Sequence, residues 1–357
     1  MSTPAPTAPI DTDAIIIGAG PVGLYQVFQL GLQEIRAHVI DALPHPGGQC
    51  AELYPDKPIY DLPGLPVCTG AELIERLLMQ IRPMQAVFHL DQLVTELTRL
   101  ADGRWQVGTT RGLTLRAPCV VIAAGVGAFV PRALAVDGLD AHLGSQLFYR
   151  VTAPDQFAGL DLVITGGEEG AVEHALRLAE AGPTQPRSIT LIHRRDNFRA
   201  PEPDLQRLRE CIAAGGIRLV LGQISALRHD ATGRLQALGV TGRDGAPLDV
   251  PLDALLVQLG ISPKLGPLTD WGLALERKQL QVDPASCATS APGVYAVGDI
   301  NSYPGKKKLI LCGFFEATLA AFAAAAQLHP DEPQPLLYTT TSPKLQRILG
   351  VAPTPSD

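Results

Sequence analysis

Near the N-terminus, short apolar runs stand on either side of an amphipathic segment, and this pattern predicts a strand, a helix and a second strand. Residues 13–17 are apolar and β-branched, residues 24–32 have helical periodicity, and residues 37–40 form the second strand. Further along, alternating segments within residues 88–107 suit a β-meander, and residues 119–125 form a buried strand that ends in small residues. The chain therefore begins with a βαβ unit followed by a meander.

The same pattern returns in the middle of the chain. Residues 161–165 and 188–192 are apolar strands, and the helix expected between them covers residues 172–181. A last apolar strand, which starts at residue 293, closes on Gly298 and Asp299. Two βαβ units in one chain predict an α/β protein with two doubly wound, three-layer nucleotide-binding domains of the ββα type.

Length, charge and cysteine spacing narrow the classes of protein. A chain of 357 residues with 46% hydrophobic and 18% charged residues suits two globular domains, and we expect no membrane-spanning segment. A net charge of -7 argues against nucleic-acid binding, and the first ten residues do not resemble a secretory signal. The six cysteines lack the spacing of a redox dithiol or a zinc knuckle, so we expect free thiols in the cytoplasm and no metal site.

Three glycines follow the first strand at the spacing of a dinucleotide-binding turn. Gly18 permits the tight turn, Gly20 lets the backbone approach a pyrophosphate, and Gly23 allows the helix to pack closely on the strand. The helix N-terminus then offers amide donors to the phosphates. Asp41 ends the second strand, 23 residues after Gly18, where a carboxylate would accept hydrogen bonds from an adenosine ribose. These residues predict a dinucleotide site for either NAD or FAD.

The residues that follow this site carry a resemblance to a known family. The chain reads Pro-Gly-Gly-Gln from Pro46 to Gln49, and Tyr54 comes five residues after Gln49. In this stretch it resembles the thioredoxin-reductase-like class of ferredoxin-NADP reductase, and the resemblance extends over about residues 13–350. It implies that the first site takes FAD, that Gln49 contacts the flavin and that Tyr54 stacks on its ring. An ordinary core position is the alternative for Tyr54.

The resemblance also gives roles to residues outside this stretch. It implies that Asp299 hydrogen-bonds the ribitol chain of FAD, in the family's second FAD signature. It further implies cofactor contacts at three apolar positions: Pro21, Val94 and Phe129. Plain core packing explains Val94 and Phe129 equally well. The expected domains are an FAD domain at 11–126 and 288–330, an NADP domain at 127–287 and a C-terminal tail at 331–357.

In the family this resemblance points to, the tail crosses to the partner subunit and covers the flavin. The chain is therefore expected to form a homodimer in which Tyr338 stacks on the ring and Thr340 makes a polar contact. Tyr54 and Tyr338 would then hold the ring during hydride transfer, which needs alignment and no acid-base residue. A tail that only covers the protein surface is the alternative.

The second βαβ unit carries a second candidate nucleotide site. Gly166 and Gly167 lead into its helix, and arginines follow its second strand, beginning with Arg194, which lies 28 residues after Gly166. Arginines at that strand end suit a 2'-phosphate, and the resemblance implies that this segment selects NADPH. The residues expected to bind NADPH are thus Gly166, Gly167, Arg194, Arg195 and Arg199. A solvated basic turn is the alternative.

One residue departs from the family at this second site. Glu168 stands where the family has the glycine that approaches the pyrophosphate, and its carboxylate adds bulk and negative charge. A flavin-binding protein with impaired use of NADPH is therefore an alternative function. An FAD-dependent oxidase, or another NAD(P)H reductase, is a further alternative.

The electron acceptor is inferred from a missing motif. Thioredoxin reductases carry a Cys-x-x-Cys pair in the nicotinamide domain, whereas this chain has no such pair. Electrons from NADPH are therefore expected to leave the flavin directly, one at a time, for ferredoxin or a similar iron-sulfur protein. Lys306 to Lys308, with Arg194 and Arg195, could face an acidic ferredoxin, although a solvated loop explains the lysines equally well.

Overall fold

The computed structural model describes residues 8–151, 153, 155–332 and 335–351, apart from the side chains of 129–130 and 261–264. The chain forms two compact units, which are described separately. Unit 1 comprises the chain up to residue 129 together with the chain from residue 263 onward, and unit 2 comprises residues 130–262. The two chain crossings between them are β11 (Ala128–Pro131) and β19 (Ile261–Lys264), which pair with each other.

The boundary at residue 263 differs from the expected boundary at residue 288. Residues 263–287 fold with unit 1 because Leu268, Leu273 and Leu280 are buried in its core. This segment contains the 3-10 helix η4 (Gly266–Asp270) and the short strands β20 (Leu275–Glu276) and β21 (Gln279–Gln281). It carries apolar residues at irregular spacing, so its sequence gave no sign of which core it joins.

Unit 1 is built on a five-stranded parallel sheet with the order β22-β10-β2-β3-β6. These strands are β2 (Ala14–Ile17), β3 (Ala37–Ile40), β6 (Val87–His89), β10 (Cys119–Ile122) and β22 (Val294–Ala296). In β2 and β10 all residues are buried, because both faces of the sheet are covered. The strands expected near residues 13–17, 37–40 and 119–125 are therefore confirmed as neighbours in one sheet.

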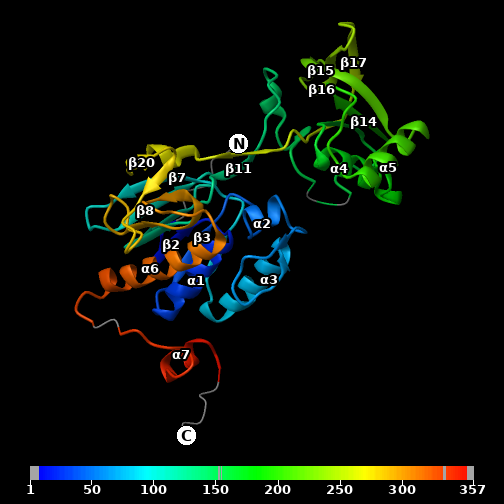
Figure 1. The fold of residues 1–357 in the computed structure, drawn as a ribbon. Helices are drawn as coiled ribbons and strands as arrows, with labels where there is room; N and C mark the ends of the chain where they lie inside the picture. The colour runs from blue at the N-terminus through cyan, green and yellow to red at the C-terminus, as the bar shows by residue number, and fades with distance from the viewer. Residues whose placement is uncertain (1–7, 152, 154, 333–334, 352–357) are drawn as a thin grey trace. The chain divides into compact units, whose positions relative to one another are not determined.

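Alternate residues of these strands face different layers. Ala14 and Ile16 of β2 pack with the helices, whereas Ile15 and Ile17 pack with the meander. The helices are α1 (Pro21–Leu32), α3 (Gly70–Ile81) and α6 (Ile310–Leu328). The meander is a four-stranded sheet of β1 (Ile10–Asp11), β9 (Thr114–Ala117), β8 (Trp105–Thr109) and β7 (Val94–Arg99). Figure 1 shows the helices and the meander on opposite sides of β2 and β3, as the expected three-layer fold requires.

Smaller elements complete unit 1 around these layers. They are α2 (Gln49–Glu52), β4 (Pro58–Ile59), β5 (Cys68–Thr69), η1 (Arg82–Met84), η5 (Gly298–Ile300), β23 (Asn301–Ser302) and α7 (Pro343–Ile348). The start of α3 is fixed by a capping box, in which Thr69 accepts from the Glu72 amide and the Glu72 carboxylate accepts from the Thr69 amide.

Unit 2 repeats the three layers with a seven-stranded sheet in the order β12-β18-β13-β14-β15-β16-β17. Its strands are β12 (Leu147–Phe148), β13 (Asp161–Thr165), β14 (Ser188–His193), β15 (Arg218–His229), β16 (Leu235–Gly242), β17 (Pro247–Pro251) and β18 (Ala254–Val257). Its helices are α4 (Glu169–Ala179) and α5 (Glu202–Ala213), with 3-10 turns η2 (Leu139–His142) and η3 (Gly182–Thr184).

The long strand β15 joins two layers of unit 2. Its first residues pair in parallel with β14, and from Gly222 onward it pairs antiparallel with β16. Residues of β13 again alternate, since Leu162 and Ile164 face the helices whereas Val163 faces the β15–β17 ribbon. Figure 1 shows α4 and α5 on the side of β14 that lies away from this ribbon. The second doubly wound domain is thus present as expected.

Helix α6 is the one helix in the described part of the chain that is long and apolar enough to cross a membrane by length and composition. The sequence itself predicts no membrane-spanning segment. One face of α6 is nevertheless buried within unit 1, where Ala320, Ala321, Ala324 and Ala325 belong to the core between helices and sheet. The same buried face carries the charged residue Glu316. These features are typical of a core helix, which passes the same length and composition test.

Candidate functional site

The first glycine turn connects β2 to α1 and is shaped by close backbone approaches. Gly18 has φ +114°, and a Cβ there would lie 2.4 Å from the Ala123 carbonyl oxygen. A Cβ on Gly23 would lie 1.9 Å from the Gly18 oxygen. A Cβ on Gly20 would have only the Gly48 Cα within 4 Å, at 3.9 Å. Gly18 and Gly23 are therefore needed for the turn itself, whereas Gly20 leaves space for a ligand to approach the backbone.

The carboxylate expected at the end of the second strand lies beside this turn. Asp41 accepts hydrogen bonds from the amides of Ala19, at 2.6 Å, and Leu43, at 2.8 Å. Burial raises the pKa of Asp41, and the two amide donors act in the opposite direction. The bond to Ala19 ties the strand end to the glycine turn, so the residue expected to bind ribose and the turn expected to bind phosphate are held together.

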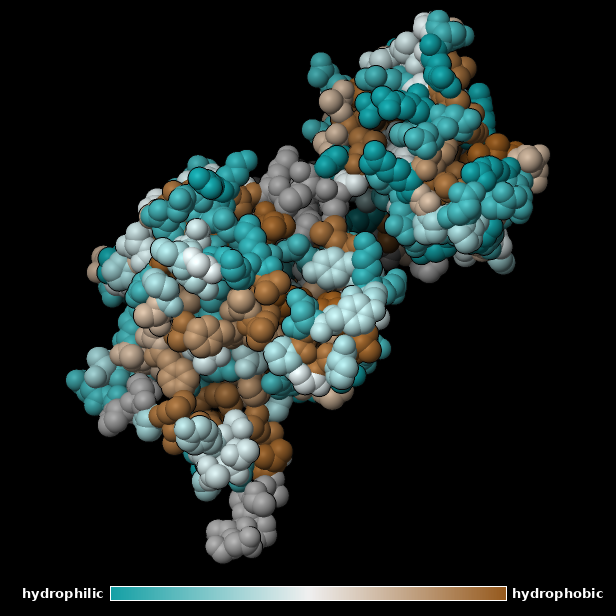
Figure 2. Space-filling view, viewed as in Figure 1, coloured by the Kyte–Doolittle hydropathy of each residue, from teal (hydrophilic) through white to brown (hydrophobic). Residues whose placement is uncertain are grey.

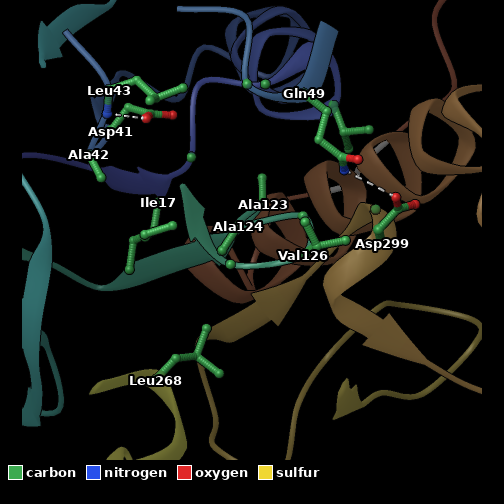
Figure 3. Close-up of a pocket in the computed structure, with 18 of the residues that line it drawn as sticks. Ile17, Asp41, Ala42, Leu43, Gln49, Ala123, Ala124, Val126, Leu268 and Asp299 are labelled. Atoms are coloured by element: carbon green, nitrogen blue, oxygen red, sulfur yellow. Dashed lines mark hydrogen bonds between the residues drawn. The ribbon is translucent and has the colours of Figure 1, made fainter. Parts of the chain in front are cut away.

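A cavity of about 1190 Å³, its open mouth included, runs along the turn. Its lining joins the glycine turn and Asp41 to Gln49 and Asp299, and this extent suits an extended dinucleotide. Of the residues expected to bind FAD, the cavity brings together Gly18, Gly20, Pro21, Asp41, Gln49, Tyr54, Val94 and Asp299. Figure 3 shows Asp41 and Asp299 in separate parts of this cavity, with Ala123, Ala124 and Val126 between them. Gly23 is buried behind the turn.

Gln49 and Asp299 meet across the cavity although they are 250 residues apart in the sequence. The Gln49 amide nitrogen lies 3.4 Å from an Asp299 carboxylate oxygen, as the dashed line in Figure 3 marks. Gln49 is the first residue of α2, and Asp299 belongs to η5, which follows β22. The two ends of the discontinuous unit therefore supply one polar pair at one end of the cavity.

Tyr54 also lines this cavity, which fits the role that the resemblance gives it. Its hydroxyl accepts a long hydrogen bond of 3.6 Å from the Cys50 thiol. Burial raises the pKa of the Tyr54 hydroxyl, and so does the contact with Cys50. The phenol stays neutral at physiological pH, so it can serve as a ring platform without adding negative charge.

Several lining residues were not predicted from the sequence. Gln92 and Leu93 precede the meander, and Leu268 and Trp271 come from the segment that had been assigned to the other domain. Lys308 also borders the cavity, just before α6. None of them belongs to a recognisable motif, although the apolar character of Leu268 and Trp271 was a signal for burial. Phe129 lies in β11, but its side chain is outside the described part of the structure.

Tyr338 and Thr340 do not line the cavity of their own chain. Tyr338 is 64% exposed, and its backbone oxygen accepts from the amides of Thr341 and Ser342 at the start of α7. The Thr340 oxygen accepts from the Gln346 side chain. The stacking role of Tyr338 and the polar contact of Thr340 therefore stay predictions about a second copy of the chain.

The second glycine turn connects β13 to α4 and has the same close approach at its first glycine. A Cβ on Gly166 would lie 2.1 Å from the Gln258 carbonyl oxygen. A Cβ on Gly167 would lie 2.2 Å from the His193 ring, which therefore packs directly on the turn. Glu168 is the N-cap residue of α4, and its side chain makes no capping hydrogen bond. The position that faced open space in unit 1 thus carries a carboxylate in unit 2.

The three predicted NADPH arginines differ in where they lie. Arg199 lies beside it, since its amide donates to the Gly167 oxygen at 2.8 Å and its guanidinium is 3.4 Å from the Glu168 carboxylate. Arg194 and Arg195 are exposed after β14. Arg194 lines a shallow hollow on β15 and β16 together with Arg243. The basic segment fits an added phosphate, whereas Glu168 does not fit a pyrophosphate.

The lysine run before α6 is not uniformly exposed, which corrects the expectation that it faces a partner or solvent as a whole. The Lys306 side chain is only 7% exposed and pairs with Glu316, which is 1% exposed. Lys307 and Lys308 are exposed. The residues around Lys306 show no apolar periodicity that would indicate burial. The buried ion pair with Glu316 could therefore not be predicted from the sequence.

All six cysteines are free, and most are poorly suited to thiol chemistry. Burial raises the pKa of Cys119 to about 12, and burial together with the Glu316 charge raises that of Cys287 to about 12. Cys287 belongs to unit 1, contrary to the expected domain limits, and Cys211 is the one cysteine in the described part of unit 2. The described residues also hold no group of three side chains suited to a metal ion.

Comparison with known proteins gives consistent matches over nearly the full chain. Residues 12–325 match the family described as pyridine nucleotide-disulphide oxidoreductase. A protein named ferredoxin-NADP reductase from Acidovorax sp. (strain JS42) is 55% identical over 355 residues, which cover 99% of this chain and 98% of the relative. A protein of the same name from Methylibium petroleiphilum is 54% identical over 344 residues, which cover 96% and 93%.

Solved structures with the same fold are more distant in sequence. Thioredoxin reductase from Lactococcus lactis has a TM-score of 0.55 and 22% identity, with 88% of this chain and 97% of that chain covered. The bacillithiol disulfide reductase Bdr from Staphylococcus aureus has a TM-score of 0.56 and 16% identity, with 90% and 100% covered. At these identities the likeness supports the two-domain α/β fold and nothing further.

Proposed function

The chain belongs to the pyridine nucleotide-disulphide oxidoreductase family and is an oxidoreductase of the ferredoxin-NADP reductase kind, and from this premise we propose that FAD occupies the cavity of unit 1. The single observation that carries this proposal is the cavity itself. It runs from the glycine turn and Asp41 at one end to Gln49, Tyr54 and Asp299 at the other. A dinucleotide with a large aromatic ring needs this combination of a phosphate turn, a ribose acceptor and a ring platform.

The residues of unit 1 divide the binding of FAD between them. The turn at Gly20 and the N-terminus of α1 hold the pyrophosphate, and Asp41 accepts from the adenosine ribose. Asp299 and Gln49 bind the flavin end, with Tyr54 against the ring. When bound, FAD accepts two electrons as a hydride and can release them one at a time. The chain's own part is alignment and the exclusion of water.

We propose NADPH as the hydride donor in the unit 2 site. Arg194 and Arg195 follow β14 where a 2'-phosphate would lie, and a guanidinium binds phosphate through charged hydrogen bonds. The Arg199 guanidinium is paired with the Glu168 carboxylate, so we expect it to contribute less than Arg194 and Arg195 to binding of the 2'-phosphate. Glu168 is expected to weaken binding of the pyrophosphate, so that NADPH is selected by its phosphate yet held with limited affinity.

The proposed acceptor is ferredoxin or a similar iron-sulfur protein. The chain has no pair of cysteines at dithiol spacing, and its buried thiols have raised pKa values, which disfavours a disulfide relay. Arg194, Arg195, Lys307 and Lys308 are exposed basic residues that an acidic partner could contact. Relatives over 50% identical and almost fully covered carry the name ferredoxin-NADP reductase, which supports this acceptor.

We further propose that the protein is a cytoplasmic homodimer in which the tail of one copy covers the flavin of the other. Figure 2 shows apolar surface toward the lower end of the view, where α6 and α7 lie in Figure 1. The exposed large apolar side chains at the start of α6 and in the segment before α7 are Leu309, Leu311, Phe315, Leu336, Leu337 and Tyr338. A monomer rarely leaves so many apolar side chains in water, and this supports an interface between two copies. With the buried face of α6 in the core, a membrane location is disfavoured.

Anaerobic stopped-flow spectroscopy tests the proposed function. The purified yellow protein is mixed with NADPH or NADH, and the flavin absorbance is followed before ferredoxin is added. We expect bleaching by NADPH, slower bleaching by NADH and recovery of colour on addition of oxidised ferredoxin. Rapid recovery in air with no transfer to ferredoxin would instead identify an oxidase. A yellow protein that NADPH does not bleach would identify a flavin-binding protein with an impaired second site.

A further inference from the structure

A buried charge network stands directly behind the flavin end of the cavity. Glu316 of α6 is 1% exposed, and both its carboxylate oxygens are occupied. One oxygen accepts from the Tyr303 hydroxyl at 2.8 Å and from Lys306 Nζ at 2.5 Å. The other accepts from the Gly298 amide at 2.7 Å and from Asn301 Nδ2 at 2.9 Å. A buried carboxylate with four donors has its desolvation offset by hydrogen bonds from every side.

The network holds both backbone groups of one residue, Gly298. Its amide donates to Glu316, and its carbonyl oxygen accepts from Lys306 Nζ at 2.9 Å. Gly298 has φ +79°, a conformation that glycine adopts easily. The ion pair therefore fixes the backbone of Gly298, which as a glycine could otherwise adopt other conformations.

Helix α6 reaches this peptide because another glycine lets it approach. A Cβ on Gly313 would lie 2.4 Å from a Val22 methyl group and 3.4 Å from the Gly298 Cα. Val22 belongs to the first turn of α1 and lines the cavity. Thus α1, α6 and η5 meet at one point, and Glu316 lies one helical turn after Gly313, where it reaches Gly298 and Asn301.

The Tyr303 hydroxyl supports the ion pair by donating a hydrogen bond to Glu316. Burial, and the hydrogen bond and charge of Glu316, raise the pKa of the Tyr303 hydroxyl, so it keeps its proton. The Lys306 ammonium also lies 5.6 Å from the centre of the Tyr303 ring. The network thus extends from α6 through the loop that follows β23 and closes on η5.

We propose that Glu316 and Lys306 are positioning residues that fix Gly298, and through it Asp299, so that the Asp299 carboxylate is held ready for the flavin end of FAD. The pair does not line the cavity, whereas Gly298 and Asp299 do. The pair therefore acts on the cofactor through the peptide it clamps. This inference rests on the proposed function, because it takes FAD as the occupant of the cavity.

The double variant Glu316→Gln/Lys306→Met separates positioning from stability. Removing one partner alone leaves an unpaired buried charge, whereas removing both leaves none. The apoprotein is prepared for wild type, each single variant and the double variant. Its thermal midpoint is measured by circular dichroism and its FAD dissociation constant by quenching of flavin fluorescence. Lys307→Met serves as the matched control, because Lys307 is the exposed neighbour in the same run.

We expect both single variants to lower the thermal midpoint and to weaken FAD binding, and the Lys307→Met control to do neither. The double variant should regain most of the lost midpoint yet still bind FAD at least about tenfold more weakly than wild type, because nothing holds both backbone groups of Gly298. Faster hydrogen exchange in a peptide covering residues 296–303 of the double variant would locate the loss at the clamp.

Two outcomes would overturn the proposal. If the double variant binds FAD within about twofold of wild type, the pair does not position the site. If the double variant does not fold, the pair serves stability and its positioning role is rejected. A wild-type apoprotein that takes up no FAD at all would reject the proposed function itself, and this outcome is visible before any variant is compared.

Discussion

The two nucleotide turns of this chain share a backbone and differ in the residue that faces a ligand. In unit 1 the turn reads Gly18, Gly20 and Gly23, whereas the corresponding positions in unit 2 are Gly166, Glu168 and Ala171. Gly18 and Gly166 each lie against a carbonyl oxygen of the neighbouring strand or its end, where a Cβ would come within 2.4 and 2.1 Å. The first glycine of the turn is present in both units. The middle glycine, which leaves space for a ligand, is present only in unit 1, and Ala171 replaces the third.

The strand ends beyond these turns differ in the same way. In unit 1 the carboxylate of Asp41 accepts from two backbone amides beside the turn. In unit 2 the His193 ring packs on the turn, and exposed arginines follow it. One scaffold thus presents a carboxylate suited to ribose hydroxyls and the other presents cations suited to a phosphate. The side chains at the strand end determine which ligand group is bound, whereas the three-layer fold determines the backbone of the turn.

The largest effect is expected from placing a methyl group at the two structural glycines. Gly18→Ala and Gly166→Ala each drive a Cβ against a backbone oxygen, and we expect each to destabilise its own unit by about 3 kcal/mol or more. Gly18→Ala should also abolish FAD binding, while Gly166→Ala should leave FAD binding intact. Urea unfolding of the apoprotein and titration with FAD measure the two effects.

Gly20→Ala is the matched control for this comparison. A Cβ there meets only the Gly48 Cα, at 3.9 Å, so the apoprotein should unfold at the same urea concentration as wild type. FAD should nevertheless bind more weakly, because the methyl group occupies the approach to the backbone. If Gly166→Ala weakened FAD binding as much as Gly18→Ala does, the two units would not be the independent sites described above.

A smaller effect is expected from restoring the missing glycine of the second site. Glu168→Gly removes a carboxylate from the pyrophosphate position and releases Arg199, and we expect NADPH to bind roughly tenfold more tightly. The Glu168 side chain makes no capping bond to α4, so the helix should lose little stability. Calorimetric titration with NADPH measures the change in affinity.

Two further variants separate the causes of this gain. Glu168→Gln keeps the bulk and removes the charge, so an intermediate affinity would assign part of the effect to each. Glu169→Gln is the matched control for the loss of one negative charge near the start of α4. Glu169 is the first residue of this helix, where its charge favours the helix N-terminus, and it does not occupy the position of the missing glycine. Equal affinity of Glu168→Gly and wild type would mean that the departure from the glycine pattern has no consequence for binding.

The fold and the first site were largely predictable because their signals are local. Apolar runs gave β2, β3 and β13 to within a residue, and the glycine spacing placed the turn on α1. The burial of alternate residues on both faces of β2 explains why these strands read as continuous apolar runs. Because both faces of the parallel sheet are apolar, helices must cover one face and the meander the other, and this gives three layers.

The parts that sequence reasoning missed depend on contacts between distant residues. Lys306 reads as one of three surface lysines, and only the position of Glu316 ten residues later on α6 makes it a buried ion-pair partner. Leu268 and Trp271 carry no motif, and they reach the cavity because the segment after β19 returns to unit 1. Such contacts are set by tertiary packing, for which a single sequence contains no periodic signal.

The smallest expected effect concerns a proton on His193 in the second site. Burial lowers the pKa of His193, and the charges of Arg194 and Arg195 lower it further. Because the folded-state pKa lies below the ordinary value of about 6.5, His193 favours the fold in its neutral form, and this contribution is lost as the pH falls below about 6.5. A bound 2'-phosphate would offset the arginine charges and favour the protonated ring. On binding of NADP⁺ the His193 ring should therefore take up a fraction of a proton, and this contribution alone favours binding as the pH falls from about 7.5 to about 6.

Calorimetry in buffers of different ionisation enthalpy measures this proton uptake directly, and two comparisons assign it to His193. His193→Asn should lose the uptake while retaining the titration of the phosphate, whose own pKa near 6 acts in the opposite direction. NAD⁺, which lacks the 2'-phosphate, should show no uptake with either protein. Equal uptake by wild type and His193→Asn would exclude the ring as the proton acceptor. The asymmetry between the two sites would then rest on Glu168 and the arginines, since in unit 1 the residue at the same strand end is a carboxylate held by two amides.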